Sequence, residues 1–174
     1  MNPRVLIGAV LLVFSGVAFA DNPYTKTGFD TIPWGTKLSS LNTTNASAVT
    51  DDSMEFHYRA DVGEGMVTRR FMFGETGLVA GESWYQAPVT IHSWNALEAK
   101  LAAAYGTPDT TDWQGLVGKM YNLSSLTKYT CYANQSAVVI HAIMDGIQFV
   151  VVVDNHHIGK FAKLQYEESH APTK

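Results

Sequence analysis

Cysteine is almost missing from this sequence. Cys131 is the only one among 174 residues, so the chain cannot close a disulfide within itself. The fold must therefore be held by a hydrophobic core rather than by covalent cross-links. Cys131 lies between Thr130 and Tyr132 in a strand-like run rather than at the start of a helix, where thiolates are favoured. We expect this thiol to be buried.

An excess of positive charge is missing as well. Lysine and arginine number 12 against 16 aspartate and glutamate residues, which gives a net charge of −4. A weakly acidic chain with scattered basic residues does not fit a nucleic-acid or anionic-membrane partner. The sequence also lacks a G-x-S-x-G motif and a glycine-rich loop followed by a helix and lysine. It predicts no nucleic-acid partner and no cofactor.

The longest apolar run lies at the N-terminus. Residues 1–20 combine Arg4, an apolar stretch from Val5 to Phe14 and a small-x-small site that ends at Ala20. This pattern is typical of a secretory signal peptide, and the apolar stretch is too short to span a membrane. We expect cleavage after Ala20, a periplasmic location, no membrane span after cleavage, one α+β domain over residues 21–168, and a flexible tail over 169–174.

Alternation of apolar and polar residues predicts most of a sheet. It marks strands over residues 54–59, 66–73 and 78–85, with short glycine-containing turns between them. Further strand-like runs occupy residues 119–123, 128–133, 137–144 and 147–153. Because the connections are short, the sequence predicts a mostly antiparallel sheet of about six strands.

Two segments have the pattern of helices. Residues 93–105 carry an apolar stripe between Ser93, a natural N-cap, and Gly106, a natural C-cap. A shorter helix is expected near residues 36–41, with Thr36 as its N-cap and Trp34 as an apolar anchor ahead of it. Each helix precedes a group of strands, so we expect both helices on one face of the sheet, in a tandem helix-plus-meander pseudo-repeat.

The same positions carry a resemblance to a family. The pattern F-x-x-I-x-W-G-x-x-x-x-x-L begins at Phe29, and L-x-x-x-L-x-x-x-Y-G-x-P begins at Leu97, with Trp113 downstream. This combination resembles a loose group of small bacterial extracytoplasmic proteins of unknown function. The resemblance implies a periplasmic location and an α+β fold, and it supplies no catalytic residues.

The last two strands suggest a binding surface. Asp145-Gly146 between them favours a type I′ turn, which sets Met144 opposite Ile147. One face of this hairpin is then wholly apolar, whereas the other is half polar and carries His141, Gln148 and Val150. Either the C-terminal segment 158–166 covers that second face, or a ligand, a partner or a second copy does. Trp84 and Tyr85 are further binding candidates, because both side chains suit interfaces.

Histidines provide the alternative chemistry. Asp154, His156 and His157 follow the last strand closely, and with His141 they are the candidate ligands of a metal or the groups of a hydrolase. No H-E-x-x-H spacing is present, and adjacent histidines of an extended chain point to opposite sides. A polar turn after a buried strand is the simpler explanation of Asp154, His156 and His157, and a hydrogen-bonded sheet residue is the simpler explanation of His141.

The sequence therefore favours a non-enzymatic periplasmic protein that acts by binding, either to a protein partner or to a copy of itself. Envelope factors and inhibitor or immunity proteins are the classes that fit. A metal-binding protein or hydrolase that uses the histidines is the first alternative. A carrier with a small-ligand pocket between helix and sheet is the second.

Overall fold

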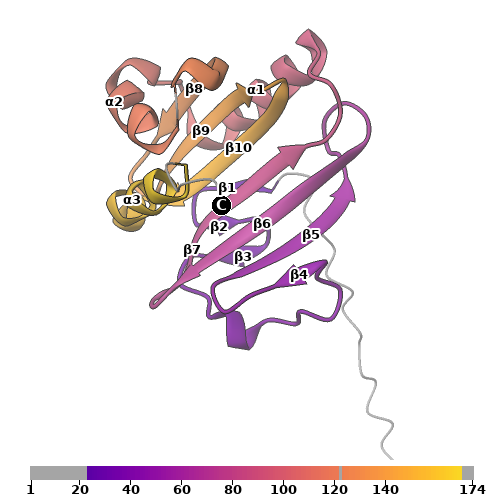
Figure 1. Cartoon of the computed structure of the whole chain (residues 1–174), viewed down its shortest axis with the longest axis vertical. Helices are drawn as coiled ribbons and strands as arrows, with labels where there is room; N and C mark the ends of the chain where they lie inside the picture. Colours follow the sequence, from indigo (N-terminus) through magenta and orange to yellow (C-terminus); the bar gives the residue numbers. More distant parts are fainter. Residues whose placement is uncertain (1–22, 122, 170–174) are drawn as a thin grey trace, which may run out of the picture.

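A computed structural model describes residues 23–121 and 123–169, and it has the predicted α+β architecture. The predicted signal peptide and all but the first residue of the predicted tail lie outside the described residues. Seven antiparallel strands form one sheet (Figure 1). Their spatial order is β4 (Ala48–Val49), β5 (Ser53–Arg59), β6 (Met66–Gly74), β7 (Gly77–Tyr85), β10 (Ile147–Asp154), β9 (Ala137–Met144) and β8 (Leu126–Ala133).

The strand order contains an internal symmetry. The meander β5–β6–β7 and the meander β8–β9–β10 meet where β7 pairs with β10, so each runs from an outer part of the sheet toward its centre. The β9–β10 hairpin has the predicted register, with Met144 opposite Ile147, and Asp145 and Gly146 both have positive φ angles of 51° and 81°. This order fits the predicted pseudo-repeat.

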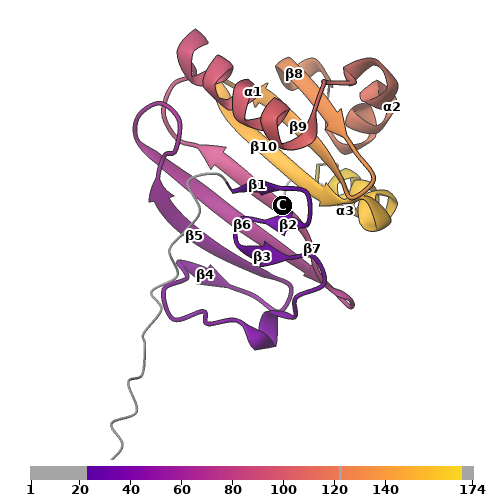
Figure 2. The same ribbon diagram turned by 180° about the vertical axis from the view of Figure 1, so that it is seen from behind.

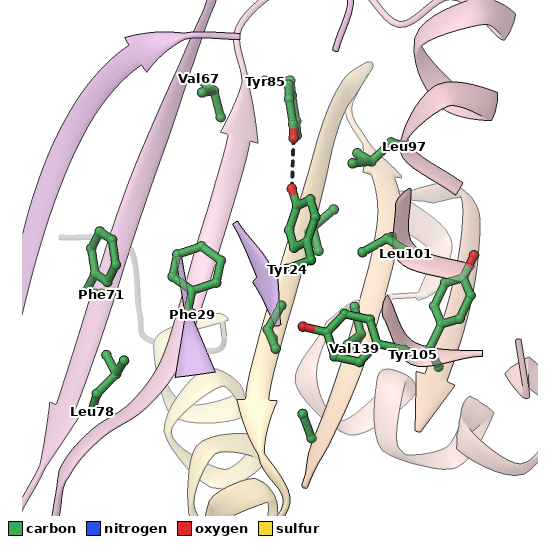
Figure 3. Close-up of a cluster of buried hydrophobic side chains, with 14 of the residues drawn as sticks. Tyr24, Phe29, Val67, Phe71, Leu78, Tyr85, Leu97, Leu101, Tyr105 and Val139 are labelled. Atoms are coloured by element: carbon green, nitrogen blue, oxygen red, sulfur yellow. Dashed lines mark hydrogen bonds between the residues drawn. The ribbon is translucent and has the colours of Figure 1, made fainter. Parts of the chain in front are cut away.

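One face of the sheet is covered from β5 to β8, while both residues of the edge strand β4 are exposed. Helix α1 (Ile91–Tyr105) lies over one half, and the short strands β1 (Tyr24–Thr25), β2 (Gly28–Phe29) and β3 (Ile32–Pro33) lie over the other half (Figure 2). Leu97 and Leu101 of α1 point toward Val139 in the sheet, and Phe29 packs edge-on against Phe71 (Figure 3). The space between α1 and the sheet is therefore filled by side chains.

Both predicted helices belong to this face, but their starts differ from the prediction. The first is a single 3₁₀ turn, η1 (Leu38–Ser40), preceded by Lys37 without a side-chain cap. Helix α1 begins earlier than predicted, because Thr90 is its N-cap and Ser93 is the third helical residue of a capping box. Trp34, partly buried against the same core as Leu38, is the apolar anchor that the sequence indicated.

The opposite face carries helices that the sequence analysis missed. Residues 110–120, partly predicted as a strand, form α2 (Thr110–Met120), and the C-terminal segment forms α3 (Ile158–Ser169). The 3₁₀ turn η2 (Leu123–Ser125) precedes β8, and the 3₁₀ turn η3 (Asn155–His157) precedes α3. Trp113, Val117 and Met120 have the spacing of one helical face, and they pack with Phe161 of α3 on Phe149 and its neighbours.

These helices cover only half of their face. The buried cluster beneath α2 and α3 is built mainly on β8, β9 and β10. Among the described residues, no helix lies over β5 and β6 on this side (Figure 1). We call this bare surface the open half-face and define it by Glu55, His57, Thr68, Arg70 and Trp84, together with Glu82, which is 4% exposed at its base.

Candidate binding face

The face that the sequence suggested for binding is closed. His141, Gln148 and Val150 have exposed fractions of 0%, 1% and 0%. They lie beneath α1, and not beneath the C-terminal segment, which covers the other face. These three residues are therefore inaccessible to a partner in this structure. The chain itself covers this face, but with α1 and not with the expected segment 158–166, so the prediction of His141, Gln148 and Val150 as binding residues is corrected.

His141 is the centre of a buried hydrogen-bond network. Its Nδ1 atom bonds to Oε1 of Glu98 on α1, and its Nε2 atom lies 2.9 Å from Nε2 of Gln148. Glu98 also accepts a hydrogen bond of 2.8 Å from the Tyr132 hydroxyl. The Trp94 ring stacks on the imidazole with a centroid distance of 3.8 Å. The network therefore joins α1 to three strands of the sheet.

The electrostatics of this network fit a neutral histidine. Burial lowers the pKa of His141 below its ordinary value, although the neighbouring Glu98 acts in the opposite direction. Burial would raise the pKa of Glu98, but hydrogen bonds from His141 and Tyr132 outweigh it and hold that pKa below its ordinary value. A neutral imidazole with Nδ1–H donates to the carboxylate and accepts from the Gln148 amide, so every ring nitrogen is satisfied.

The other two sequence candidates separate, as neighbours in a strand must. Tyr85 is buried on the α1 face, where its hydroxyl lies 2.8 Å from the Tyr24 hydroxyl and donates to Asp61 over 2.9 Å (Figure 3). Tyr85 is thus a core residue. Trp84 points to the opposite side and is partly exposed on the open half-face.

Two cross-strand rows make up the open half-face. In the first row Arg70 of β6 stands between Glu55 of β5 and Glu82 of β7, so a cation is flanked by two carboxylates. In the second row Thr68 stands between His57 and Trp84. Side chains directly opposite each other on one face of a sheet are near neighbours. The rows therefore place one positive charge and one large aromatic ring at the centre of the surface.

Several of these side chains are held in place. The Trp84 ring stacks on Phe149 at a centroid distance of 4.5 Å, and its Nε1 donates to Glu82 over 3.1 Å. The Thr68 hydroxyl lies 3.0 Å from Nδ1 of His57 and accepts from Nε2 of Gln86 over 2.9 Å. A preorganised surface loses less side-chain entropy when a partner binds.

The open half-face is hollowed. A depression of about 450 Å³ has in its lining Glu55, Thr68, Arg70, Glu82, Trp84, Tyr85, Gln86 and Ile147. A second groove of about 1020 Å³ adjoins it at Arg70 and runs toward the start of α3. The two depressions therefore form one binding-sized surface that starts at Ile147 and ends beside α3.

The histidines proposed as ligands are not gathered into one site. His141 lies beneath α1, whereas Asp154, His156 and His157 surround the start of α3 on the other side. Asp154 and His157 do meet, with 2.9 Å between Oδ2 and Nδ1. Within the described part of the chain, no three His, Cys, Asp or Glu residues are grouped as a metal ion requires.

The fold and the site define an α+β protein whose seven-stranded antiparallel sheet is half bare on one face. No family model, no curated protein and no solved structure matches this chain. None of the helices in the described ranges 23–121 and 123–169 is both long and apolar enough to cross a membrane.

Proposed function

We propose that this protein acts as a binding protein and holds a partner protein on the open half-face. The single observation that carries this proposal is the asymmetry of the sheet. On the side opposite α1, helices α2 and α3 bury the half built by β8–β10, while the half built by β5 and β6 is left to solvent. An exposed sheet face that carries partly buried aromatic and arginine side chains is typical of an interaction surface.

The chemistry of the surface indicates a protein ligand. Trp84 and Met72 supply apolar contact area that continues the core under α2 and α3. Arg70 between Glu55 and Glu82 supplies charges of both signs. A partner surface with an apolar centre, an acidic group opposite Arg70 and a basic group opposite Glu55 would be complementary.

The size of the surface determines how far the partner extends. Strands β6 and β7 have nine residues each, which corresponds to about 30 Å in length at ~3.3 Å per residue. Three strands spaced by ~4.8 Å then give a footprint of about 400 Å². A stable interface buries about 800 Å² per partner. We therefore infer that the partner also occupies the adjoining groove beside α3.

Charge reversal at the centre of the surface tests this proposal. The mature protein is used as bait in a periplasmic extract, in three forms: wild type, Arg70→Glu and Lys119→Glu. Lys119 is exposed on α2, away from the open half-face, so its variant has the same change in net charge. A partner identified by mass spectrometry should be captured by wild type and Lys119→Glu, and at least tenfold less by Arg70→Glu.

Two further measurements make the outcome decisive. The purified partner is titrated against all three forms by calorimetry, and each form is unfolded with urea to show that the fold is retained. Equal affinity of Arg70→Glu and wild type for every captured partner would place the interface elsewhere and refute the proposal.

We also propose that the protein is exported to the periplasm. The support for this is the pattern of residues 1–20, whose charged start, apolar stretch and Ala18-x-Ala20 end match a cleavable signal. Fractionation of cells followed by intact mass measurement checks it. The periplasmic fraction should contain a chain that begins at Asp21, and a cytoplasmic full-length chain would contradict the proposal.

A further inference from the structure

The groove beside α3 contains a second arrangement with its own chemistry. Thr76, His157 and Asp154 come from three different segments: the β6–β7 turn, the 3₁₀ turn η3 and the end of β10. The Thr76 hydroxyl lies 2.9 Å from Nε2 of His157, and Nδ1 of the same ring lies 2.9 Å from Oδ2 of Asp154. A hydroxyl, an imidazole and a carboxylate are thus linked in series by two hydrogen bonds.

The direction of the hydrogen bonds follows from the donors available. The ionised carboxylate of Asp154 can only accept, so Nδ1 of His157 carries the proton. In a neutral imidazole the other nitrogen is then an acceptor, and the Thr76 hydroxyl donates to it. This is the polarity that a hydroxyl nucleophile, its general base and the carboxylate that orients the base require.

The three side chains become more buried from Thr76 to His157 to Asp154, which is the order that this chemistry needs. Thr76 is exposed, the His157 side chain is 25% exposed, and the Asp154 side chain is 10% exposed. Asp154 is fixed further because its other carboxylate oxygen, Oδ1, accepts from the backbone N–H of His156 over 3.2 Å. The hydroxyl is therefore accessible to a ligand, while the carboxylate that orients the imidazole is sheltered.

The surroundings of Thr76 are rigid and include basic groups. The start of β7 is anchored by bonds of 3.0 Å and 2.8 Å between Leu78 and the backbone of Gly35 and Thr36. The Lys37 ammonium donates to the carbonyl of Glu75, the residue before Thr76. Thr76, His157, Lys37 and Lys160 all line the groove of about 1020 Å³. An ammonium group near the nucleophile is suited to stabilise negative charge on a reacting carbonyl oxygen.

We propose that Thr76, His157 and Asp154 form a hydrolytic site for carboxylic esters in this groove. The Thr76 oxygen attacks the ester carbonyl while Nε2 of His157 takes the hydroxyl proton. The bond to the alcohol oxygen breaks, and His157 gives the proton to that oxygen. Water then attacks the acyl-Thr76 ester with His157 as base, which releases the carboxylic acid and restores the threonine. Thr76 and His157 are catalytic residues, and Asp154 is a positioning residue.

Thr76 and His157 line the groove that the proposed partner also enters, but neither they nor Asp154 belong to the open half-face. The ester assay uses no partner, so its failure and the failure of the binding proposal are distinguishable. The site also sharpens the hydrolase alternative drawn from the sequence. That alternative included Asp154 and His157, which the structure brings together, and it lacked Thr76, which is 81 residues away in the chain.

Hydrolysis of p-nitrophenyl acetate by the full mature protein tests the site. The forms compared are wild type, Thr76→Val, Thr76→Ser, His157→Gln and the matched control His156→Gln, whose side chain is exposed beside the site. Wild type, Thr76→Ser and His156→Gln should release p-nitrophenol well above the buffer rate. In Thr76→Val and His157→Gln the rate of p-nitrophenol release should be at least tenfold lower than in wild type, because the nucleophile or its base is removed.

Additional measurements distinguish a catalytic role of these residues from a purely structural one, in which the Thr76–His157 hydrogen bond only joins the β6–β7 turn to the start of α3. Peptide mapping after a short reaction should find an acetyl group on Thr76 in wild type and on no residue of the site in Thr76→Val. The wild-type rate should fall as the pH is lowered, because a protonated imidazole cannot act as base. Asp154→Asn should reduce the rate at every pH, since its amide favours the wrong tautomer of His157, with its urea unfolding midpoint near that of wild type.

Three outcomes would overturn the proposal. These are a wild-type rate equal to that of Thr76→Val, an acetyl group found only outside the site, and full activity in His157→Gln. The first result together with loss of activity in His157→Gln would mean that the imidazole itself is the nucleophile.

Discussion

Replacement of His141 by leucine tests whether its network fastens α1 to the sheet. Leucine fills similar space, so the main losses are two hydrogen bonds, each with a net value of about 1 kcal/mol. The Gln148 amide, 1% exposed, is left without its acceptor, which costs about 1–2 kcal/mol more. We expect His141→Leu to lower the free energy of unfolding by about 3–4 kcal/mol.

A double-mutant cycle isolates the interaction. Gln148→Leu alone leaves Nε2 of His141 without a donor, whereas the double variant His141→Leu/Gln148→Leu removes both partners. The Ser93 hydroxyl, which donates to Oε1 of Gln148 over 3.3 Å, loses this acceptor but also donates to the Thr90 carbonyl over 3.0 Å, so it is not left unpaired. The double variant should therefore be less destabilised than the sum of the single variants by about 1–2 kcal/mol.

Urea unfolding followed by circular dichroism measures these free energies, and thermal unfolding provides a second readout. For a domain of this size each kcal/mol corresponds to about 2–4 °C in melting temperature. A loss below 1 kcal/mol for His141→Leu, or additivity within about 0.5 kcal/mol, would refute the argument that this network stabilises the fold.

Three other predictions follow from burial and packing. Burial lowers the folded-state pKa of His141, so the unfolded chain binds more protons than the folded chain below about pH 6.5. Urea titrations should therefore show a free energy of unfolding that decreases as the pH falls below this value. In His141→Leu the free energy of unfolding should depend less on pH. Gly81→Ala would place a Cβ 2.0 Å from the buried Phe29 ring and should cost about 3 kcal/mol, whereas the control Gly115→Ala, with open space around it, should be neutral or stabilising. Burial raises the pKa of Cys131 to about 12, so a thiol reagent should modify it only after unfolding; rapid modification of the native protein would contradict its burial.

Local sequence patterns were sufficient to predict much of the sheet. The alternation over residues 54–85 and the Asp145-Gly146 turn identified five of the long strands and the register of one hairpin, because side-chain period and turn chemistry are local properties. Helix α2 was missed in part because Gly115 and Gly118 weaken its local helix propensity, and packing on Phe149 overrides that weakness.

The candidate sites also divide into features that residue type indicated and features that only long-range contacts revealed. Trp84 was identified from residue type alone, but its neighbours Thr68 and Arg70 gained significance only through cross-strand pairing. The sequence left open what covers His141, because a half-polar hairpin face has the same local pattern whether water or a helix lies against it. Glu98, 43 residues away, satisfies that polarity.

The sequence by itself determined the absence of intrachain disulfides, the strands, the central turn and the amphipathic character of α1, since each depends on composition or on neighbours a few residues apart. The tertiary structure alone decided which faces are covered. It buried His141 beneath α1, left Arg70 and Trp84 on a bare half-sheet, and joined Thr76 to His157. These outcomes depend on contacts between segments far apart in the chain, and their energies are not encoded in any short stretch of residues.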